Sequence, residues 1–158
     1  MSRRNLAAVL LAALLFAVAA GCGGGPQQVT ATELVQKGDA ICRTEQTRFS
    51  QIQAQPPANA SIAADQTKRL VDAAERAGSE LRDLEPPENL RPAYDRYLEA
   101  RDRAADEIKK GLEAADNQDA RVYGTAQSAV ARSAPERQKL ARSLGFKACS
   151  QSTAIGAP

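Results

Sequence analysis

Apolar side chains recur at alternating steps of three and four residues along three stretches of the chain, 63–84, 94–115 and 123–144. The clearest of these seams consists of Ala63, Thr67, Leu70, Ala74, Ala77, Leu81 and Leu84. This spacing is typical of helices that pack side by side at a small crossing angle. No run of alternating Val, Ile and Thr indicates a strand, so we expect an all-α fold.

Capping residues and prolines predict the ends of the first two helices. Thr30 and Glu33 have the spacing of a capping box, so a first helix is expected from Thr30 to about Gln53. The proline pairs at 56–57 and 86–87 end the first and second helices, because a proline disfavours helix in the residue before it.

The second half of the chain predicts two more helices and completes a bundle. A polar turn at 116–119 separates them, and Gly145 is suited to the left-handed conformation that ends a helix. Pro135 removes one backbone donor, so we expect a kink there; a split helix is the alternative. Short links predict an up-down-up-down antiparallel four-helix bundle over 30–150, followed by a tail at 151–158. Many seam positions are Ala or Thr, so we expect close packing with little room for a ligand cavity.

The first residues have the pattern of a secretory leader. Arg3 and Arg4 precede an unbroken apolar run over 6–20, and small residues lead to Cys22. A basic segment, an apolar segment and small residues are the successive parts of a signal peptide. As a helix the run would span about 22 Å, short of the roughly 30 Å of a bilayer core, which argues against a transmembrane anchor.

The string AAGC, which ends at Cys22, resembles the lipobox of bacterial lipoproteins. The resemblance implies that the leader, 1–21, is cleaved and that the sulfur of Cys22 receives a diacylglycerol group. The mature chain would then be lipid-anchored at the extracytoplasmic face of the cell membrane. An ordinary cleaved signal with an incidental Cys is the alternative. Residues 22–29 form a flexible tether with a reach on the order of 25 Å, so we expect the domain to stand close to the bilayer.

Removal of the leader leaves a chain without net charge. The full sequence has 21 Lys and Arg against 19 Asp and Glu, and the leader accounts for Arg3 and Arg4. A balanced chain lacks the basic surface that nucleic-acid binding requires, so no nucleic-acid partner is expected.

The absence of histidine removes most catalytic chemistry from consideration. Without it there is no Ser-His or Cys-His nucleophile pair, no imidazole base and no common zinc or haem motif. Asp102 and Asp106 form a carboxylate pair, which we interpret as part of a solvated helix face with local ion pairs. We therefore expect no enzyme activity, no catalytic residue, no cofactor and no metal site.

Two cysteines remain after Cys22, namely Cys42 and Cys149. Outside the cytoplasm, an even pair of cysteines is most simply a disulfide. Two separate buried thiols are the alternative. A metal site is disfavoured, because two thiolates without a histidine leave the coordination incomplete.

Three charged residues, Glu45, Arg101 and Arg137, fall on the apolar spacing of their helices. In one interpretation the arginine stems lie along the seam with their charged ends in water. In the other, a half-buried carboxylate–guanidinium cluster fixes the register of the bundle. A bridge between Cys42 and Cys149 would bring Arg137 to the level of Glu45. We therefore expect Glu45 to pair with Arg101 or Arg137 in the middle of the bundle.

The whole layout resembles small lipoproteins and secreted proteins of actinobacteria. Three motifs carry the resemblance: GDAIC ending at Cys42, LEPP at 84–87, and GFKAC ending at Cys149. The resemblance implies a helical bundle and a disulfide, and it implies no mechanism.

The function that follows from these expectations is that of a membrane-tethered, non-enzymatic interaction or scaffold module, whose partner would be another envelope protein. The alternative is a ligand-binding or sensor lipoprotein with a pocket between its helices. A large, dry, apolar cavity would favour the alternative, and a filled core would favour the first.

Overall fold

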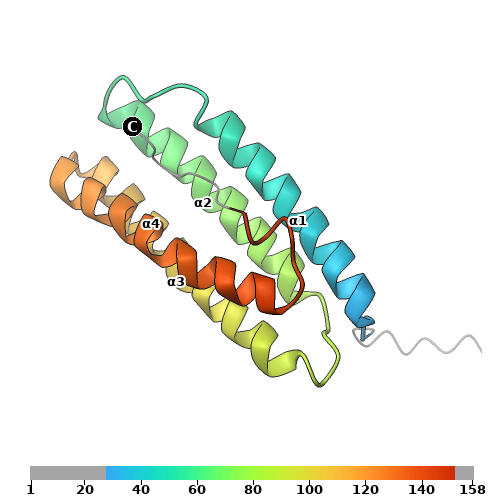
Figure 1. Ribbon diagram of the computed structural model, residues 1–158. Coiled ribbons are helices and arrows are strands. Elements are labelled where there is room, and N and C mark those ends of the chain that lie inside the picture. Colours follow the sequence, from blue (N-terminus) through green and yellow to red (C-terminus); the bar gives the residue numbers. More distant parts are fainter. Residues whose placement is uncertain (1–27, 152–158) are drawn as a thin grey trace, which may run out of the picture.

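The computed structural model describes residues 28–151, which form four long helices joined by short connections (Figure 1). The helices are α1 (Ala31–Ile52), α2 (Ala60–Arg82), α3 (Arg91–Asp116) and α4 (Ala120–Ser143). They run alternately up and down, so the expected all-α four-helix bundle is confirmed. The leader, Cys22 and the tail beyond Gln151 lie outside the described residues.

No helix within residues 28–151 is both long enough and apolar enough to cross a membrane.

Local hydrogen bonds mark the start of α1 and the end of α4 where the sequence predicts them. Thr30 caps α1: its Oγ1 accepts from the N–H of Glu33 at 3.2 Å, and the Glu33 carboxylate accepts from the N–H of Thr30 at 2.8 Å. At the other end, Gly145 has a φ of 84°, and Phe146 N–H donates to the carbonyl of Ala141 at 3.0 Å. This left-handed ending turns the chain back towards α1.

Pro135 lies inside α4, which is a single helix from Ala120 to Ser143. The alternative of two separate helices is therefore wrong. In the turn before Pro135, the carbonyl of Val130 accepts from the Ser133 hydroxyl at 2.9 Å and from Arg137 Nη1 at 3.5 Å. The bond that Pro135 cannot make is the one to the carbonyl of Ala131, the next residue of the same turn.

The helices pack in chain order, α1 on α2, α2 on α3 and α3 on α4. No Cα atom of α1 lies within 8 Å of a Cα atom of α4, and the structure describes both helices in full. Figure 1 shows instead that the segment after α4 crosses over to α1. The fourth side of the bundle is therefore not closed by helix packing, which corrects the expectation of close packing all round.

Two apolar clusters make up the core. The proximal cluster lies at the end where α1 begins and consists of Val29, Leu34, Leu81, Tyr94, Tyr97, Ala141, Leu144 and Phe146. The distal cluster lies at the end where α1 finishes and consists of Phe49, Ile52, Leu70, Val71, Ala73, Ala74, Ile108 and Val130. Each of α1, α3 and α4 carries, between the levels of the two clusters, one of the charged seam residues named in the sequence analysis. We call Glu45, Arg101 and Arg137 the polar layer.

The chain enters the bundle at the proximal end, beside the link between α2 and α3. Val29 N–H donates to the carbonyl of Glu85 at 2.9 Å, and Gln28 Nε2 donates to the carbonyl of Pro86 at 3.3 Å. These bonds fix the start of α1 against the α2–α3 link.

Candidate functional site

A cavity of about 560 Å³ lies at the level of the polar layer, with side chains of all four helices in its wall. Several lining residues on α2, α3 and α4 are very small: Ala74, Gly78, Ala104, Ala105 and Ala134. Short side chains on three helices, together with the distance between α1 and α4, leave this space unfilled. The expectation that small seam residues would close the bundle is therefore wrong, because α1 does not approach α4.

Glu45 and Arg101 form an ion pair in the wall of this cavity. Arg101 Nη2 lies 2.7 Å from Glu45 Oε1, and the two side chains are 15% and 12% exposed. Arg101 Nη1 also donates to the Tyr97 hydroxyl at 3.4 Å, and the guanidinium carbon lies 5.8 Å from the centre of that ring. Of the two expected partners of Glu45, it is Arg101 that makes the contact. Its charged end is in the bundle and not in bulk water.

One nitrogen of Arg101 is left without a partner. Arg101 Nε is buried and has no hydrogen bond within the part of the chain that the structure describes. Burial by itself would lower the pKa of Arg101, but the carboxylate of Glu45 more than offsets this and keeps the pKa above its ordinary value. The side chain is therefore a cation with an unused donor, and a buried unused donor costs about 1–3 kcal/mol.

Arg137 lines the same cavity but has no carboxylate partner. Its Nη1 donates to the Ser133 hydroxyl and, at 3.5 Å, to the carbonyl of Val130. Within residues 28–151, no carboxylate oxygen lies within 4.0 Å of its guanidinium nitrogens. Burial lowers the pKa of Arg137, and the nearby Arg101 cation lowers it further. The polar layer thus holds two guanidinium groups and one carboxylate.

The other charged residues of the cavity lie at the seam between α2 and α3. Arg82 pairs with Asp102, and Lys109 Nζ lies 2.9 Å from Glu75 Oε1. These four side chains are 45–52% exposed, and Asp106 beside them is exposed as well. Their charges are paired or exposed to solvent, and Arg137 is the half-buried charge of the cavity wall that has no ion-pair partner within residues 28–151.

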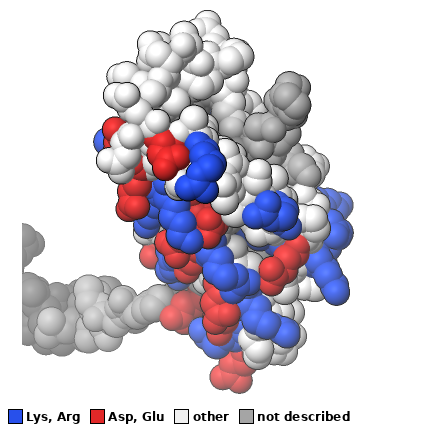
Figure 2. Space-filling model, turned by 90° about the vertical axis from the view of Figure 1, so that its left-hand side faces the viewer, with Lys and Arg blue, Asp and Glu red and all other residues white. Residues whose placement is uncertain are grey.

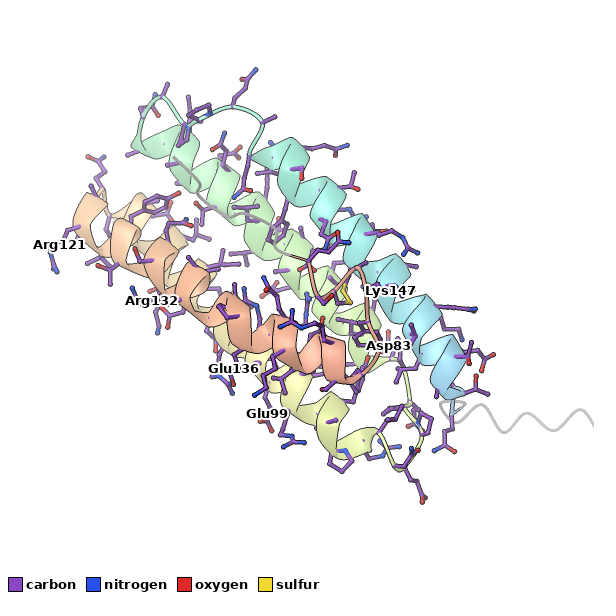
Figure 3. All side chains as sticks on the ribbon, in the orientation of Figure 1. Asp83, Glu99, Arg121, Arg132, Glu136 and Lys147 are labelled. Atoms are coloured by element: carbon purple, nitrogen blue, oxygen red, sulfur yellow. A yellow bond between two sulfur atoms is a disulfide. The ribbon has the colours of Figure 1, made fainter. Side chains whose placement is uncertain are left out.

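The Cys42–Cys149 disulfide joins α1 to the segment after α4 (yellow bond in Figure 3). The two Cα atoms lie 5.1 Å apart, and the bridge spans 107 residues of sequence. The structure therefore contains the pairing expected from the sequence. Both cysteines also line the cavity, so the bridge forms part of its wall on the side between α1 and α4.

The side chain of Asp39 binds the backbone of the segment after α4, a role that the sequence analysis missed. This aspartate is 7% exposed, and its carboxylate accepts from the N–H groups of Ala148 at 2.8 Å and Lys147 at 3.0 Å. Gln46 Nε2 adds a bond to the carbonyl of Ala148 at 2.7 Å. The one signal in the sequence was an acid close to Cys42 on the inner face of the first helix.

Phe146 closes the proximal end of the bundle. Its ring centre lies 5.6 Å from that of Tyr97 and 6.3 Å from that of Tyr94. Gly38 lies directly beneath it: a Cβ atom at this position would stand 2.6 Å from Phe146 Cε1. The absence of a side chain at Gly38 therefore allows the aromatic cluster to form against α1.

The structure brings together all the site residues predicted within the described region: Cys42, Glu45, Arg101, Arg137 and Cys149. The predicted lipid-attachment residue, Cys22, lies outside it. Within residues 28–151, no group of three or more His, Cys, Asp or Glu side chains is placed to hold a metal ion.

Comparison of the chain with protein-family models, with curated proteins and with solved structures gives no match in any of the three.

Proposed function

We propose that this protein is a membrane-tethered lipoprotein that binds a small polar molecule in the cavity of its bundle, without catalysing a reaction. The observation that carries this proposal is a cavity of about 560 Å³ whose wall includes three charged residues of the polar layer, Glu45, Arg101 and Arg137. That volume falls within the range of about 300–1,000 Å³ that is usual for small-molecule sites. A bound polar ligand could pair with Arg137, which has no carboxylate within 4.0 Å among residues 28–151.

The character of the cavity favours a polar ligand over an apolar one. The cavity is neither the filled core that a pure scaffold would have nor a dry apolar pocket. Glu45, Arg101 and Arg137 all line it, and an apolar occupant would remove their remaining access to water. Desolvation of these charges without new hydrogen bonds would oppose binding.

Two features support a location outside the cytoplasm. The leader and the AAGC string that ends at Cys22 resemble those of lipoproteins. The disulfide between Cys42 and Cys149 is a bond that persists in oxidising compartments. Because Val29 is bonded to the link between α2 and α3, a lipid on Cys22 would hold the proximal end of the bundle near the bilayer. The cavity, which lies between the two apolar clusters, would then lie farther from the membrane than the proximal cluster.

Native mass spectrometry tests the binding function. The full-length protein is extracted from membranes in a mild nonionic detergent, and we expect one small molecule bound to each chain. The variant Ala134→Leu places a larger side chain in the cavity and should remove the bound mass. Ala131→Leu, on the exposed face of the same helix, is the matched control and should retain it. A ligand-free mass in every preparation, with no thermal stabilisation by any compound of a mixed small-molecule library, would contradict the proposal.

Membrane fractionation tests the tether. We expect the protein in the membrane fraction, and we expect Cys22→Ala to release it into the soluble fraction or to leave the leader uncut. Membrane partition that is unchanged in the Cys22→Ala variant would contradict the lipid anchor.

A second candidate function, that of an interaction module, is favoured by the distal end of the bundle. Residues 49–64 and 122–131 contain no Asp, Glu, Lys or Arg, and both segments lie at the end where α1 finishes and α4 begins. Ile62 and Val122 are exposed there, at 42% and 36%. Figure 2 shows an uncharged upper end above a body that carries both signs of charge. Co-purification of one envelope protein that is lost in Ile62→Glu and kept in Asp72→Lys, a charge variant of another exposed residue on α2, would support this function.

A further inference from the structure

We propose that the Cys42–Cys149 bridge is a redox-active disulfide that exchanges with an incoming dithiol, with Cys149 as the sulfur that is attacked and Cys42 as the leaving thiolate. The hydroxyl of Tyr97 stabilises that thiolate. This inference is independent of the proposed binding function, because it rests on the contacts of the two sulfur atoms and not on the contents of the cavity.

A hydroxyl donor lies beside the sulfur of Cys42. Tyr97 Oη is 3.6 Å from Cys42 Sγ, and the hydroxyl is the donor because a disulfide sulfur carries no proton. Arg101 Nη1 donates to the same hydroxyl oxygen at 3.4 Å, which makes the hydroxyl a stronger donor. Burial raises the pKa of Tyr97, so the hydroxyl keeps its proton at neutral pH. The charge of Glu45, one turn beyond Cys42, is offset by its pair with Arg101.

Cys149 has the opposite surroundings. The carbonyl oxygen of Gly38 lies 3.4 Å from Cys149 Sγ, where it can accept from a thiol but cannot stabilise a thiolate. The carboxylate of Asp39 accepts from the Cys149 N–H at 3.4 Å, and a second negative charge beside it is disfavoured. After reduction, the negative charge therefore belongs on Cys42 and the proton on Cys149.

The exposure of the two cysteines agrees with these roles. Cys42 is 1% exposed, whereas Cys149 is partly exposed on the segment after α4 (Figure 3). A thiol that approaches from solvent therefore reaches Cys149 Sγ more readily. Exchange is faster when the leaving sulfur is a stabilised thiolate, and attack at Cys149 makes Cys42 that leaving group.

The exchange is a two-electron reduction in two steps. A thiolate of the dithiol attacks Cys149 Sγ, a mixed disulfide forms, and the bond to Cys42 Sγ breaks with its electron pair on Cys42. The second thiol of the dithiol then attacks the dithiol sulfur of the mixed disulfide and releases Cys149. The dithiol is oxidised to a disulfide. Of the two protons that it gives up, one goes to Cys149 and the other to water.

The segment after α4 has other attachments to the bundle, so reduction need not unfold the protein. Asp39 accepts from the N–H groups of Lys147 and Ala148, and Gln46 donates to the carbonyl of Ala148. The ring of Phe146 packs 5.6 Å from that of Tyr97, measured between ring centres. These contacts would keep the two sulfur atoms close, so that oxidation can restore the bridge.

Exchange with reduced glutathione tests the roles of the two cysteines. The full-length protein in nonionic detergent is mixed with glutathione, quenched with acid and digested with pepsin, and mass spectrometry locates the mixed disulfide. We expect glutathione on Cys149 and a free thiol at Cys42. Glutathione on Cys42, or on both cysteines in equal amounts, would overturn the assignment. No exchange in the folded protein would overturn the redox activity itself.

A pair of tyrosine variants on α3 tests the hydroxyl. Tyr97→Phe removes the donor to Cys42 Sγ, and we expect it to slow reduction by dithiothreitol by about threefold or more. It should also shift the equilibrium with glutathione towards the protein disulfide. Tyr94→Phe is the matched control, because Tyr94 is equally buried and donates to the carbonyl of Leu81. Equal rates and equilibria in the two variants would overturn the role of Tyr97.

Nuclear magnetic resonance of the reduced protein tests where the charge lies. The Cβ shift of ¹³C-labelled cysteine distinguishes a thiol from a thiolate, and Cys149→Ser identifies the signal of Cys42. We expect the pKa of Cys42 to lie below the ordinary thiol value of about 8.5 and that of Cys149 to lie above it. Circular dichroism of the same sample should show an intact helical fold. The reverse order of pKa values, or loss of helix on reduction, would contradict a reversible exchange of this kind.

Discussion

Arg101 Nη2 donates a hydrogen bond to Glu45 Oε1 at 2.7 Å, and this bond joins α3 to α1 across the interior of the bundle. The two helices have no pair of Cα atoms within 8 Å, although the structure describes both completely. The two long side chains therefore make a connection that the backbones of α1 and α3 do not.

The ion pair predicts strong non-additivity of its single variants. Arg101→Ala and Glu45→Ala each leave a mostly buried charge unpaired, which costs about 3–5 kcal/mol. The double variant should lose less than the sum, because no lone charge of the pair remains. We also expect Glu45→Ala to be the worse single change, since it leaves two guanidinium groups without any carboxylate. Urea unfolding of the four proteins measures this, and strictly additive losses would show that the pair makes no net interaction.

We expect Asp39 to stabilise the fold through its hydrogen bonds to backbone N–H groups, without an ion-pair partner. Asp39→Ala removes the acceptor of the Lys147 and Ala148 N–H groups, and we expect it to lower the free energy of unfolding by about 2–3 kcal/mol. Asp72→Ala is the matched control, because Asp72 is 55% exposed in a surface pair and should lose less than about 1 kcal/mol. Equal losses in the two variants would mean that Asp39 does not hold the segment after α4.

Two glycines predict opposite effects of the same substitution. At Gly38 a new Cβ meets Phe146, so Gly38→Ala should cost about 1–3 kcal/mol. At Gly124, inside α4, a Cβ meets no atom within 4 Å, and Ala is the better helix former by about 1 kcal/mol. Gly124→Ala should therefore raise the thermal midpoint and Gly38→Ala should lower it. An unchanged thermal midpoint in Gly38→Ala would contradict the placement of Phe146 on α1.

The local features of this fold could be predicted from the sequence, because each depends on residues close together in the chain or on an obvious pairing. Thr30 with Glu33 marks the start of α1, and Gly145 marks the end of α4. The pairing of Cys42 with Cys149 followed from a count of cysteines in a chain that the sequence predicts to be exported.

The cavity could not be predicted, because seam spacing shows which face of a helix is buried and not how far apart two helices stand. Ala134 fits a close helix contact as well as it fits the wall of an open space. Asp39 was missed for a related reason: its partners are backbone N–H groups, which carry no signature in the sequence. Whether a carboxylate lies near Arg137 also depends on the distances between helices, which the seam spacing does not give.

The two buried tyrosines predict a loss of stability at alkaline pH. Burial disfavours the phenolate and raises the pKa of Tyr97, which Arg101 partly opposes, and burial also raises the pKa of Tyr94. An unfolded tyrosine has a pKa of about 10. Between that value and the higher folded pKa, the unfolded chain releases protons that the folded chain retains, so the free energy of unfolding falls as pH rises. Below about pH 10 the tyrosines contribute no such slope.

Tyr97→Phe should remove part of this dependence. Urea unfolding at about pH 8 and about pH 11 compares the parent protein with the variant, and the difference between the two pH values should be smaller for the variant. The same difference in both proteins would mean that Tyr97 is not buried as described.

One pair of substitutions on α4 tests directly whether the cavity is an open space. Ala134 lines the cavity, and Ala141, seven residues further on, is 0% exposed in the proximal cluster. The added volume is the same in Ala134→Leu and Ala141→Leu, and urea unfolding gives the free energy of each. We predict a change of less than about 0.5 kcal/mol for Ala134→Leu, and a loss of about 1–3 kcal/mol for Ala141→Leu, where no space is available. A similar loss at both positions would contradict the account, because it would mean that the polar layer is filled.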